Sequence, residues 1–335
     1  MRRVALLLVV LAVLTTAPAA AAGPSWAQAE IRTVVEAGFM APSVSSFRPN
    51  DSLTRRELAQ VLATATREEQ TVVDGQRPVT LRELNAALVR AVGLGAAARA
   101  VLGKLAAAGL RPPARAGTET VARLLKLRYN HPAARDDREL RPADPVTRAE
   151  TAYSLARVLE LSEDDLASVQ ERVDAWTLPR FSDWQRRVLT RAVRFVGLPY
   201  VWGGTSERPH APFGVPTRGG FDCSGFVWRV YKLERFAGAP QLARTLRGRT
   251  TYAMSGEMRR ADRVAFARLV PGDVVFFGAR GPRSQPAEVG HMGIYVGGGW
   301  FVHSSGQGTT LAPLSGWYAE SFAWGRRPLR EAGLA

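Results

Sequence analysis

The sequence predicts an all-α repeat region followed by a domain of the α+β class, and three observations lead to this prediction. A helix-start motif recurs in the first half of the chain. A lone cysteine, Cys223, stands where a helix of the second half is expected to begin. Two short apolar segments that suit strands, one containing His291 and the other His303, are separated by three glycines.

Composition places the chain among globular proteins with a strong positive charge. Its 335 residues suit two domains, and 46% hydrophobic residues argue against extended disorder. A single cysteine excludes a disulfide scaffold and a Cys-rich zinc module. The net charge is +15, and most of the excess falls in residues 185–330. That charge indicates work near a polyanion, such as nucleic acid, anionic lipid or an anionic wall polymer.

Residues 1–22 have the pattern of a signal peptide and read MRRVALLLVVLAVLTTAPAAAA. Basic Arg2 and Arg3 precede an apolar run from Ala5 to Leu14, which is about half the length of a membrane span. Small residues follow, as signal peptidase requires. We therefore expect an exported protein, with a buried N-terminal helix as the alternative. No later segment is long and apolar enough to predict a transmembrane helix.

Residues 25–162 contain three copies of a helix-start pattern. Residues 47–62 read FRPNDSLTRRELAQVL, residues 140–155 read LRPADPVTRAETAYSL, and residues 78–92 read PVTLRELNAALVRAV. In each copy a threonine is followed three residues later by glutamate and then by a periodic apolar run, which is the capping-box pattern. Three capped helices would suffice to explain this, but the shared Arg-Pro prefix of two copies favours a true repeat.

The first copy also carries a family resemblance. Trp26-Ala27, Gly38-Phe39 and the Thr-Arg-Arg-Glu sequence at residues 54–57 resemble one S-layer homology repeat. Residues 140–150 resemble the second half of another repeat, whereas the middle copy lacks the Trp-Ala opening and the Thr-Arg start. The resemblance implies that residues 25–162 form three helical repeats that bind an anionic cell-wall polysaccharide.

Two arginines are candidate polysaccharide contacts. Arg55 and Arg148 each directly follow a capping threonine, and a helix N-terminus already favours anions. A solvated helix face is the alternative for both. Residues 163–184 are charged and end in a proline-containing segment, so they predict a helix and a linker before the second domain.

Cys223 is the candidate nucleophile. The apolar spacing after it predicts a helix that begins at or near this residue, and the partial positive charge of a helix start lowers a thiol pKa. A small buried hydrophobe is the alternative for a lone cysteine. Export, the helix start and the polar neighbours Asp222 and Ser224 favour a reactive thiol.

A nucleophilic cysteine needs a base, and the glycine-linked strands supply two histidines. His131 and His210 lie in proline-flanked loops and are expected at the surface. A hairpin centred on Gly297 would place His291 directly opposite His303 on one face of the sheet. One histidine would then be the base and the other would orient it. Two structural histidines, or a zinc site with the cysteine, are the alternatives.

Five segments in chain order carry a second family resemblance: Tyr200-Val-Trp-Gly-Gly-Thr-Ser, Phe221-Asp-Cys-Ser-Gly-Phe-Val, Pro271-Gly-Asp-Val-Val-Phe-Phe, His291-Met-Gly-Ile-Tyr-Val-Gly and Phe301-Val-His-Ser-Ser. Over residues 185–330 they resemble the NlpC-like family of bacterial cell-wall cysteine peptidases. The resemblance implies a papain-like fold, in which the cysteine helix packs on an antiparallel sheet. It makes Cys223 the nucleophile, His291 the general base and His303 the orienting residue.

The same resemblance implies a substrate and further contacts. The substrate would be peptidoglycan, cut in its peptide stems between D-glutamate and the following diamino acid. Tyr200 would help to bind the oxyanion, and Asp222 and Ser224 would bind the free amine of the substrate. The stretch between Gly204 and Phe221 is longer than is typical of the family and could border the groove ahead of the cysteine or form a plain surface loop.

The sequence therefore predicts a secreted, monomeric peptidoglycan hydrolase that needs no metal or cofactor. An amidase or acyl transferase that uses the same three residues is one alternative. A wall-binding protein without catalysis is another, although the complete set of cysteine and two histidines argues against it. Nucleic acid is not expected as a partner, because the chain has no recognised reading motif and is predicted to be exported.

Overall fold

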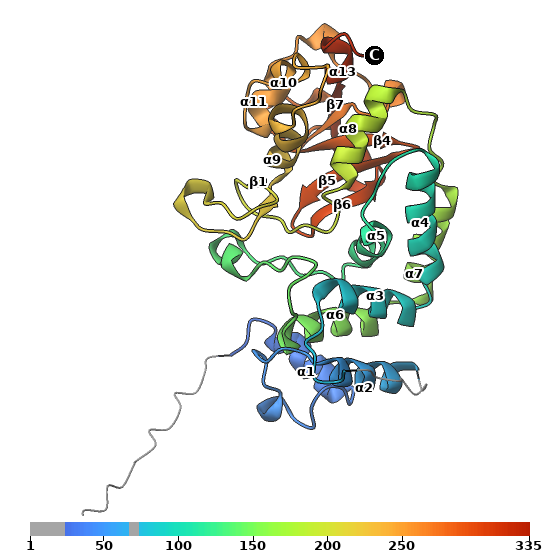
Figure 1. Cartoon of the computed structure of the whole chain (residues 1–335), viewed down its shortest axis with the longest axis vertical. Helices are drawn as coiled ribbons and strands as arrows, with labels where there is room; N and C mark the ends of the chain where they lie inside the picture. Colours follow the sequence, from blue (N-terminus) through green and yellow to red (C-terminus); the bar gives the residue numbers. More distant parts are fainter. Residues whose placement is uncertain (1–23, 67–73) are drawn as a thin grey trace, which may run out of the picture.

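The computed structural model describes residues 24–66 and 74–335, so the expected signal peptide at 1–22 lies outside the described residues. A helical region comes first, and its helices are α1 (Gln28–Glu36), α2 (Arg55–Thr66), α3 (Leu81–Ala91), α4 (Gly95–Ala107), α5 (Ala116–Leu124), α6 (Arg148–Glu160) and α7 (Glu163–Ala175). A 3-10 segment, η2 (Ala133–Arg138), lies between α5 and α6. Figure 1 shows α1 and α2 at the end of the molecule farthest from the sheet.

The second region is an α+β domain, as predicted. Its helices are α8 (Asp183–Val193), α9 (Cys223–Trp228), α10 (Leu242–Thr245), α11 (Thr251–Gly256), α12 (Trp317–Glu320) and α13 (Pro328–Glu331). Its strands are β1 (Thr205–Ser206), β2 (Gly220–Phe221), β3 (Val274–Gly278), β4 (Val289–Gly297), β5 (Trp300–Ser305), β6 (Gly308–Pro313) and β7 (Phe322–Arg326). Strands β6-β5-β4-β3-β7 form an antiparallel sheet in that order, and α9 packs against β4 and β5.

The three helix starts of the helical region meet in a closed ring of backbone hydrogen bonds. The N–H of Leu53 donates to Val146 O, that of Val146 donates to Val79 O, and that of Val79 donates to Leu53 O, each at 2.9 Å. All three side chains are buried, and α2, α3 and α6 begin within two residues of them. The degenerate middle copy is therefore structurally equivalent to the other two.

Ion pairs follow the same ring. Arg148 at the start of α6 pairs with Glu57 of α2, and Arg55 at the start of α2 pairs with Glu83 of α3. The third copy of this contact is missing because the middle sequence has buried Leu81 where the others have arginine. The capping box forms fully at Thr80 and Glu83, as the sequence predicts.

The structure corrects the expectation for Arg148. Its side chain is only 3% exposed, and besides Glu57 its guanidinium donates to the carbonyls of Phe47 and Met40. The prediction that Arg148 contacts polysaccharide is therefore wrong. In an isolated helix an arginine directly after the capping residue would face solvent, but here the neighbouring repeat covers its side chain.

The two regions share one apolar core. Trp176, just after α7, stacks on Trp300 at the start of β5 with ring centroids 4.8 Å apart. Its indole N–H donates to Gly297 O at 3.1 Å. Arg123 of α5 donates to the carbonyls of Gln307 and Gly197. The predicted linker, residues 163–184, is thus a helix and an extended segment packed between the regions (Figure 1).

Within the described residues, no single helix has the length and hydropathy of a membrane span. Helices α3 and α4, which meet at a bend of 117°, have together the length and composition of one, by those two criteria alone.

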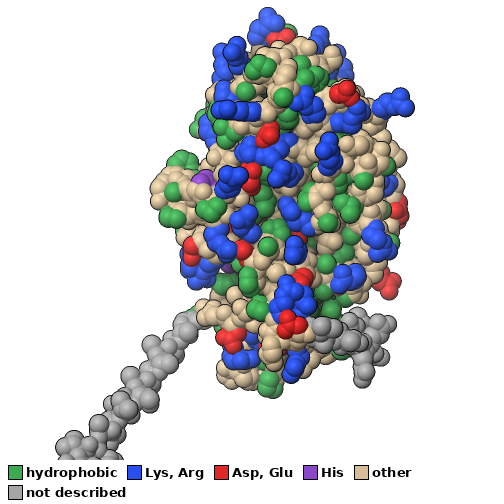
Figure 2. All heavy atoms as spheres, in the orientation of Figure 1, with side chains coloured by type: hydrophobic (Ala, Val, Ile, Leu, Met, Phe, Trp, Pro, Cys, Tyr) green, Lys and Arg blue, Asp and Glu red, His purple; other side chains and the backbone are tan. Residues whose placement is uncertain are grey.

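Figure 2 shows Lys and Arg side chains spread over the viewed face of both regions, with fewer acidic ones between them.

We predict that Arg148→Ala lowers the free energy of unfolding by about 3 kcal/mol, because it leaves a partly buried carboxylate and two carbonyls without their donor. Arg157→Ala is the control, since among the described residues Arg157 forms an ion pair with exposed Glu160 alone, and its loss should cost less than about 1 kcal/mol. Urea unfolding of both variants measures the difference, and equal midpoints would contradict the structural role given to Arg148.

Candidate active site

Cys223 is the first residue of α9, where the sequence predicts a helix start. Asp222 is the N-cap residue, and its carboxylate accepts a hydrogen bond from the N–H of Gly225. Packing fixes the direction of this short helix, because Phe226 lies in the core with Phe221 and Phe195. The nucleophile candidate is therefore held on a rigid element and not on a loop.

The sulfur of Cys223 is deeply buried, with only 9% of the residue exposed. The backbone N–H groups of Ser224 and Met292 and the side chain of Thr251 form hydrogen bonds with it, which favour the thiolate. Burial, aided by the negative charge of Asp222, outweighs them and raises the pKa of the thiol to about 12. The expectation of a lowered pKa is therefore wrong in direction, because burial exceeds the effect of the helix start.

His291 and His303 meet on one face of the sheet. His291 Nε2 lies 2.9 Å from His303 Nδ1, so the two rings share a hydrogen bond. Burial lowers the pKa of His291 to about 4 and holds that of His303 well below its usual value. Both rings are therefore neutral at neutral pH.

The predicted register of this hairpin is wrong by two residues. Gly293, not His291, lies opposite His303, so the histidines are diagonal neighbours. The turn is formed by Gly298 and Gly299, both with positive φ, and the register shifts between Tyr295 and Gly297. Because a shift of two preserves the face, the histidines still meet.

Cys223 and His291 are brought together by the packing of α9 on β4. The sulfur accepts a hydrogen bond from the N–H of Met292, which follows His291 directly. Among the described residues no hydrogen bond joins the sulfur to the imidazole, and His291 Nδ1 has no partner. The hydroxyl of Tyr318 lies 3.4 Å from His303 Nε2 at the far end of the pair.

Tyr200 lies beside the cysteine, as the resemblance implies. Burial raises the pKa of its phenol, and the charges of Cys223 and Asp222 raise it further. The phenol therefore keeps its proton and can donate a hydrogen bond. Its backbone forms a bridge with Phe221, which ties it to the strand before α9.

Asp222 and Ser224 hold the structure around the cysteine together. Besides capping α9, the Asp222 carboxylate accepts from the hydroxyl of Ser224 and from the N–H of Gly203, both at 2.9 Å, and pairs with Arg249 at 3.3 Å. Arg249 also donates to Ser224 Oγ at 2.7 Å. These contacts make Asp222 and Ser224 positioning residues, and their contact with the substrate amine stays a prediction.

The most unexpected neighbour of the site comes from the helical region. Asp136 of η2 is 5% exposed, and its Oδ2 accepts from the N–H of Trp202 at 3.1 Å. Its other carboxylate oxygen is buried without a hydrogen-bond partner. Its negative charge adds to the raised pKa of Tyr200, which places it close to that phenol.

Sequence reasoning missed Asp136, Arg249, Thr251 and Tyr318. The threonine that caps α11, Thr250, was a usable signal for the Arg249–Thr251 segment. Asp136 had no signal, because it lies in the other region and reaches the site only through tertiary packing.

His131 is buried and bonded to Glu150 at 2.8 Å, so its predicted surface position is wrong.

Residues 205–220 form a hairpin in which β1 pairs with β2. The ring of Phe213 at its tip lies against Gly203, near Tyr200. In the described ranges, no group of three His, Cys, Asp or Glu side chains could hold a metal ion.

Comparison with known proteins agrees with this geometry. The model of the NlpC/P60 family matches residues 197–327, and that of the S-layer homology domain matches residues 20–59. Both resemblances stated from the sequence are therefore confirmed, that to the S-layer homology domain over one repeat.

Individual relatives match the C-terminal domain. The probable peptidoglycan endopeptidase LytE of Bacillus subtilis is 33% identical over 39% of this chain and 30% of its own length. The murein DD-endopeptidase MepH of Escherichia coli is 33% identical over 38% of this chain and 39% of its own. An NlpC/P60 family crystal structure from Bacillus cereus is 26% identical, covers 46% of this chain and 43% of that one, and has a TM-score of 0.33. The chain thus spans 30% and 39% of the lengths of these two curated relatives.

We predict that alkylation of Cys223 by iodoacetamide is slow at neutral pH and rises about tenfold per pH unit toward pH 12, because the thiolate is the reacting form. Since Cys223 is the single cysteine, whole-protein mass measures the reaction and Cys223→Ala is the blank. A rate that levels off near pH 7 would contradict a thiol whose pKa is raised by burial.

Proposed function

We propose that the protein is a secreted cysteine peptidase that hydrolyses peptide stems of peptidoglycan between D-glutamate and the following diamino acid. The observation that carries the proposal is Cys223 at the start of α9, next to a histidine pair whose nitrogens lie 2.9 Å apart. The names of the matched relatives support a peptidoglycan endopeptidase. The choice of bond rests on the family resemblance.

The pKa values define the resting protonation states of Cys223 and His291. With the pKa of the thiol at about 12 and that of His291 at about 4, the pair rests as neutral thiol and neutral imidazole. Proton transfer therefore accompanies attack and does not precede it. His291 Nδ1, the free ring nitrogen, accepts the thiol proton while the sulfur bonds to the substrate carbonyl carbon.

His303 and Tyr200 then stabilise the two charged groups that form during attack, the imidazolium and the oxyanion. The Nε2–H of the His291 imidazolium donates to His303 Nδ1, which fixes the tautomer and stabilises the new charge. The protonated Tyr200 phenol donates to the oxyanion. His291 gives its proton to the departing amine, which leaves an acyl-enzyme on Cys223. Water, deprotonated by His291, releases the acid and restores the thiol.

An amidase or acyl transferase could use the same residues, and the product distinguishes them. A transferase would pass the acyl group to an amine, and an amidase would cut the bond between glycan and peptide. A non-catalytic wall-binding protein is favoured by one observation, the deep burial and raised pKa of the Cys223 thiol.

We also propose that residues 25–162 attach the protein to an anionic wall polysaccharide. The match of the S-layer homology model to residues 20–59 and the three-membered ring of helix starts support this role. Arg55 remains a candidate contact because its side chain is about a third exposed, although it also pairs with Glu83. Release of the full chain from purified walls by an anionic but not a neutral competitor polysaccharide is the expected result. Release by both would contradict the proposal.

We predict that Cys223→Ala lowers hydrolysis of purified peptidoglycan more than 100-fold, equivalent to about 2.7 kcal/mol, because no other group can form the acyl-enzyme. Mass spectrometry of the released fragments measures the rate and identifies the bond. Residual activity within tenfold of wild type would contradict the cysteine mechanism. Fragments ending at another bond would contradict only the proposed specificity.

We predict a graded loss at the histidines. His303→Gln should retain more activity than His303→Ala, because an amide can still accept from His291, and both should exceed His291→Ala, which lacks the base. The measurement is kcat/KM for the three variants, with and without a chelator. Equal losses at both positions together with chelator sensitivity would instead indicate a metal site.

A further inference from the structure

A cavity of about 850 Å³ lies where the helical region meets the α+β domain. Its walls come from the start of α3, the segment that leads into α5, the loop at 141–144 and the residues that follow α8. It is separate from the sulfur and the histidine pair, none of which lines it. Helix α5 begins at its wall, and the start of a helix adds partial positive charge.

Four arginines line this cavity: Arg82, Arg115, Arg141 and Arg194. None of them forms an ion pair with a carboxylate among the described residues; Arg115 donates only to the carbonyls of Val196 and Arg194. Burial lowers the pKa of Arg115, and repulsion from Arg123, Arg82 and Arg141 lowers it further, so these charges act on one another. Arg82 and Arg194 are exposed.

The carboxylates of the cavity do not neutralise these arginines, because each is paired with an arginine outside it. The pairs are Glu83 with Arg55, Glu119 with Arg123, Asp144 with Arg218, and Glu207 with Arg229. Glu119 is the partial exception, since its charge also acts on Arg115, but it is fully buried and bonded to Arg123. When these outside partners are counted with the lining, arginines outnumber carboxylates around the cavity, so its surroundings carry a surplus of positive charge.

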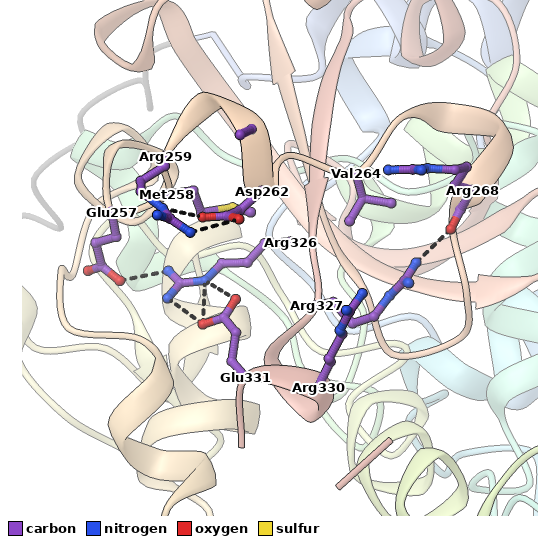
Figure 3. A pocket seen from close by; sticks show the side chains of 11 residues that line it. Glu257, Met258, Arg259, Asp262, Val264, Arg268, Arg326, Arg327, Arg330 and Glu331 are labelled. Atoms are coloured by element: carbon purple, nitrogen blue, oxygen red, sulfur yellow. Dashed lines mark hydrogen bonds and ion pairs between the residues drawn. The ribbon is translucent and has the colours of Figure 1, made fainter. Parts of the chain in front are cut away.

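A second arginine-rich pocket in the α+β domain is arranged differently (Figure 3). There Arg326 lies between Glu257 and Glu331, and Arg259 pairs with Asp262. Two of its five arginines are thus paired with carboxylates of the same lining. In the described structure, the junction cavity differs in that each of its four arginines is left without an ion pair.

We propose that the junction cavity binds a segment of anionic polysaccharide that bears carboxylate or phosphate groups. Guanidinium groups bind both anions through paired N–H donors, and four of them around one cavity suit a ligand with several charges. The anion site follows from the arginines themselves. The choice of a wall polysaccharide as its ligand rests on the proposed function.

The test measures binding of the full chain to four probes by titration calorimetry: polygalacturonate for carboxylate, polyphosphate for phosphate, duplex DNA, and neutral dextran. The variant is Arg82→Ala/Arg141→Ala/Arg194→Ala. The control, Arg235→Ala/Arg260→Ala/Arg283→Ala, removes the same charge from exposed arginines of the α+β domain that form no side-chain ion pair in the described structure. Thermal unfolding of both variants verifies that they are folded.

We expect at least one anionic probe to bind, dextran not to bind, and the junction variant to raise Kd at least tenfold while the control changes it less than twofold. The better anionic probe identifies carboxylate or phosphate as the preferred group. The proposal is overturned by failure of both anions to bind, by equal losses in the two variants, or by tighter binding of duplex DNA. Hydrolysis is not measured, so failure of the peptidase proposal would not alter this result.

Discussion

The carboxylate of Asp222 is the constraint on which the rest of the site depends. It caps α9 and so fixes Cys223, it accepts from the N–H of Gly203 in the loop after Tyr200, and it pairs with Arg249, two residues before Thr251. One buried charge therefore sets the position of the nucleophile and of two segments that touch it. The same charge adds to burial in raising the pKa of the Cys223 thiol, so the residue that positions the nucleophile also makes it less acidic.

Burial decides the chemical character of the site. It raises the pKa of the cysteine and lowers that of both histidines, which makes a neutral pair and not an ion pair the resting form. Burial also joins the two regions, through the stack of Trp176 on Trp300 and the bond from Trp202 to Asp136. The helical region is thus part of the body that holds the site, and the proposed wall attachment and hydrolysis would occur in one rigid unit.

Local signals in the sequence predicted what is local in the structure. The cap and apolar spacing placed Cys223 at a helix start, and the glycines predicted the hairpin, but its register shift depends on a bulge that no sequence pattern marked. The sign of the thiol pKa and the burial of Arg148 were predicted wrongly, because both depend on what packs over them. Asp136 reaches the site from another region and could not be predicted at all.

The central claim is that Cys223 carries the acyl group of the substrate during hydrolysis. The most direct measurement is mass spectrometry of the protein quenched in acid while it turns over a soluble peptidoglycan stem peptide. The account predicts a mass increase equal to the acyl half of the peptide, located on the fragment that contains Cys223. Turnover with no covalent adduct on that fragment, under conditions in which a thioester survives, would contradict it.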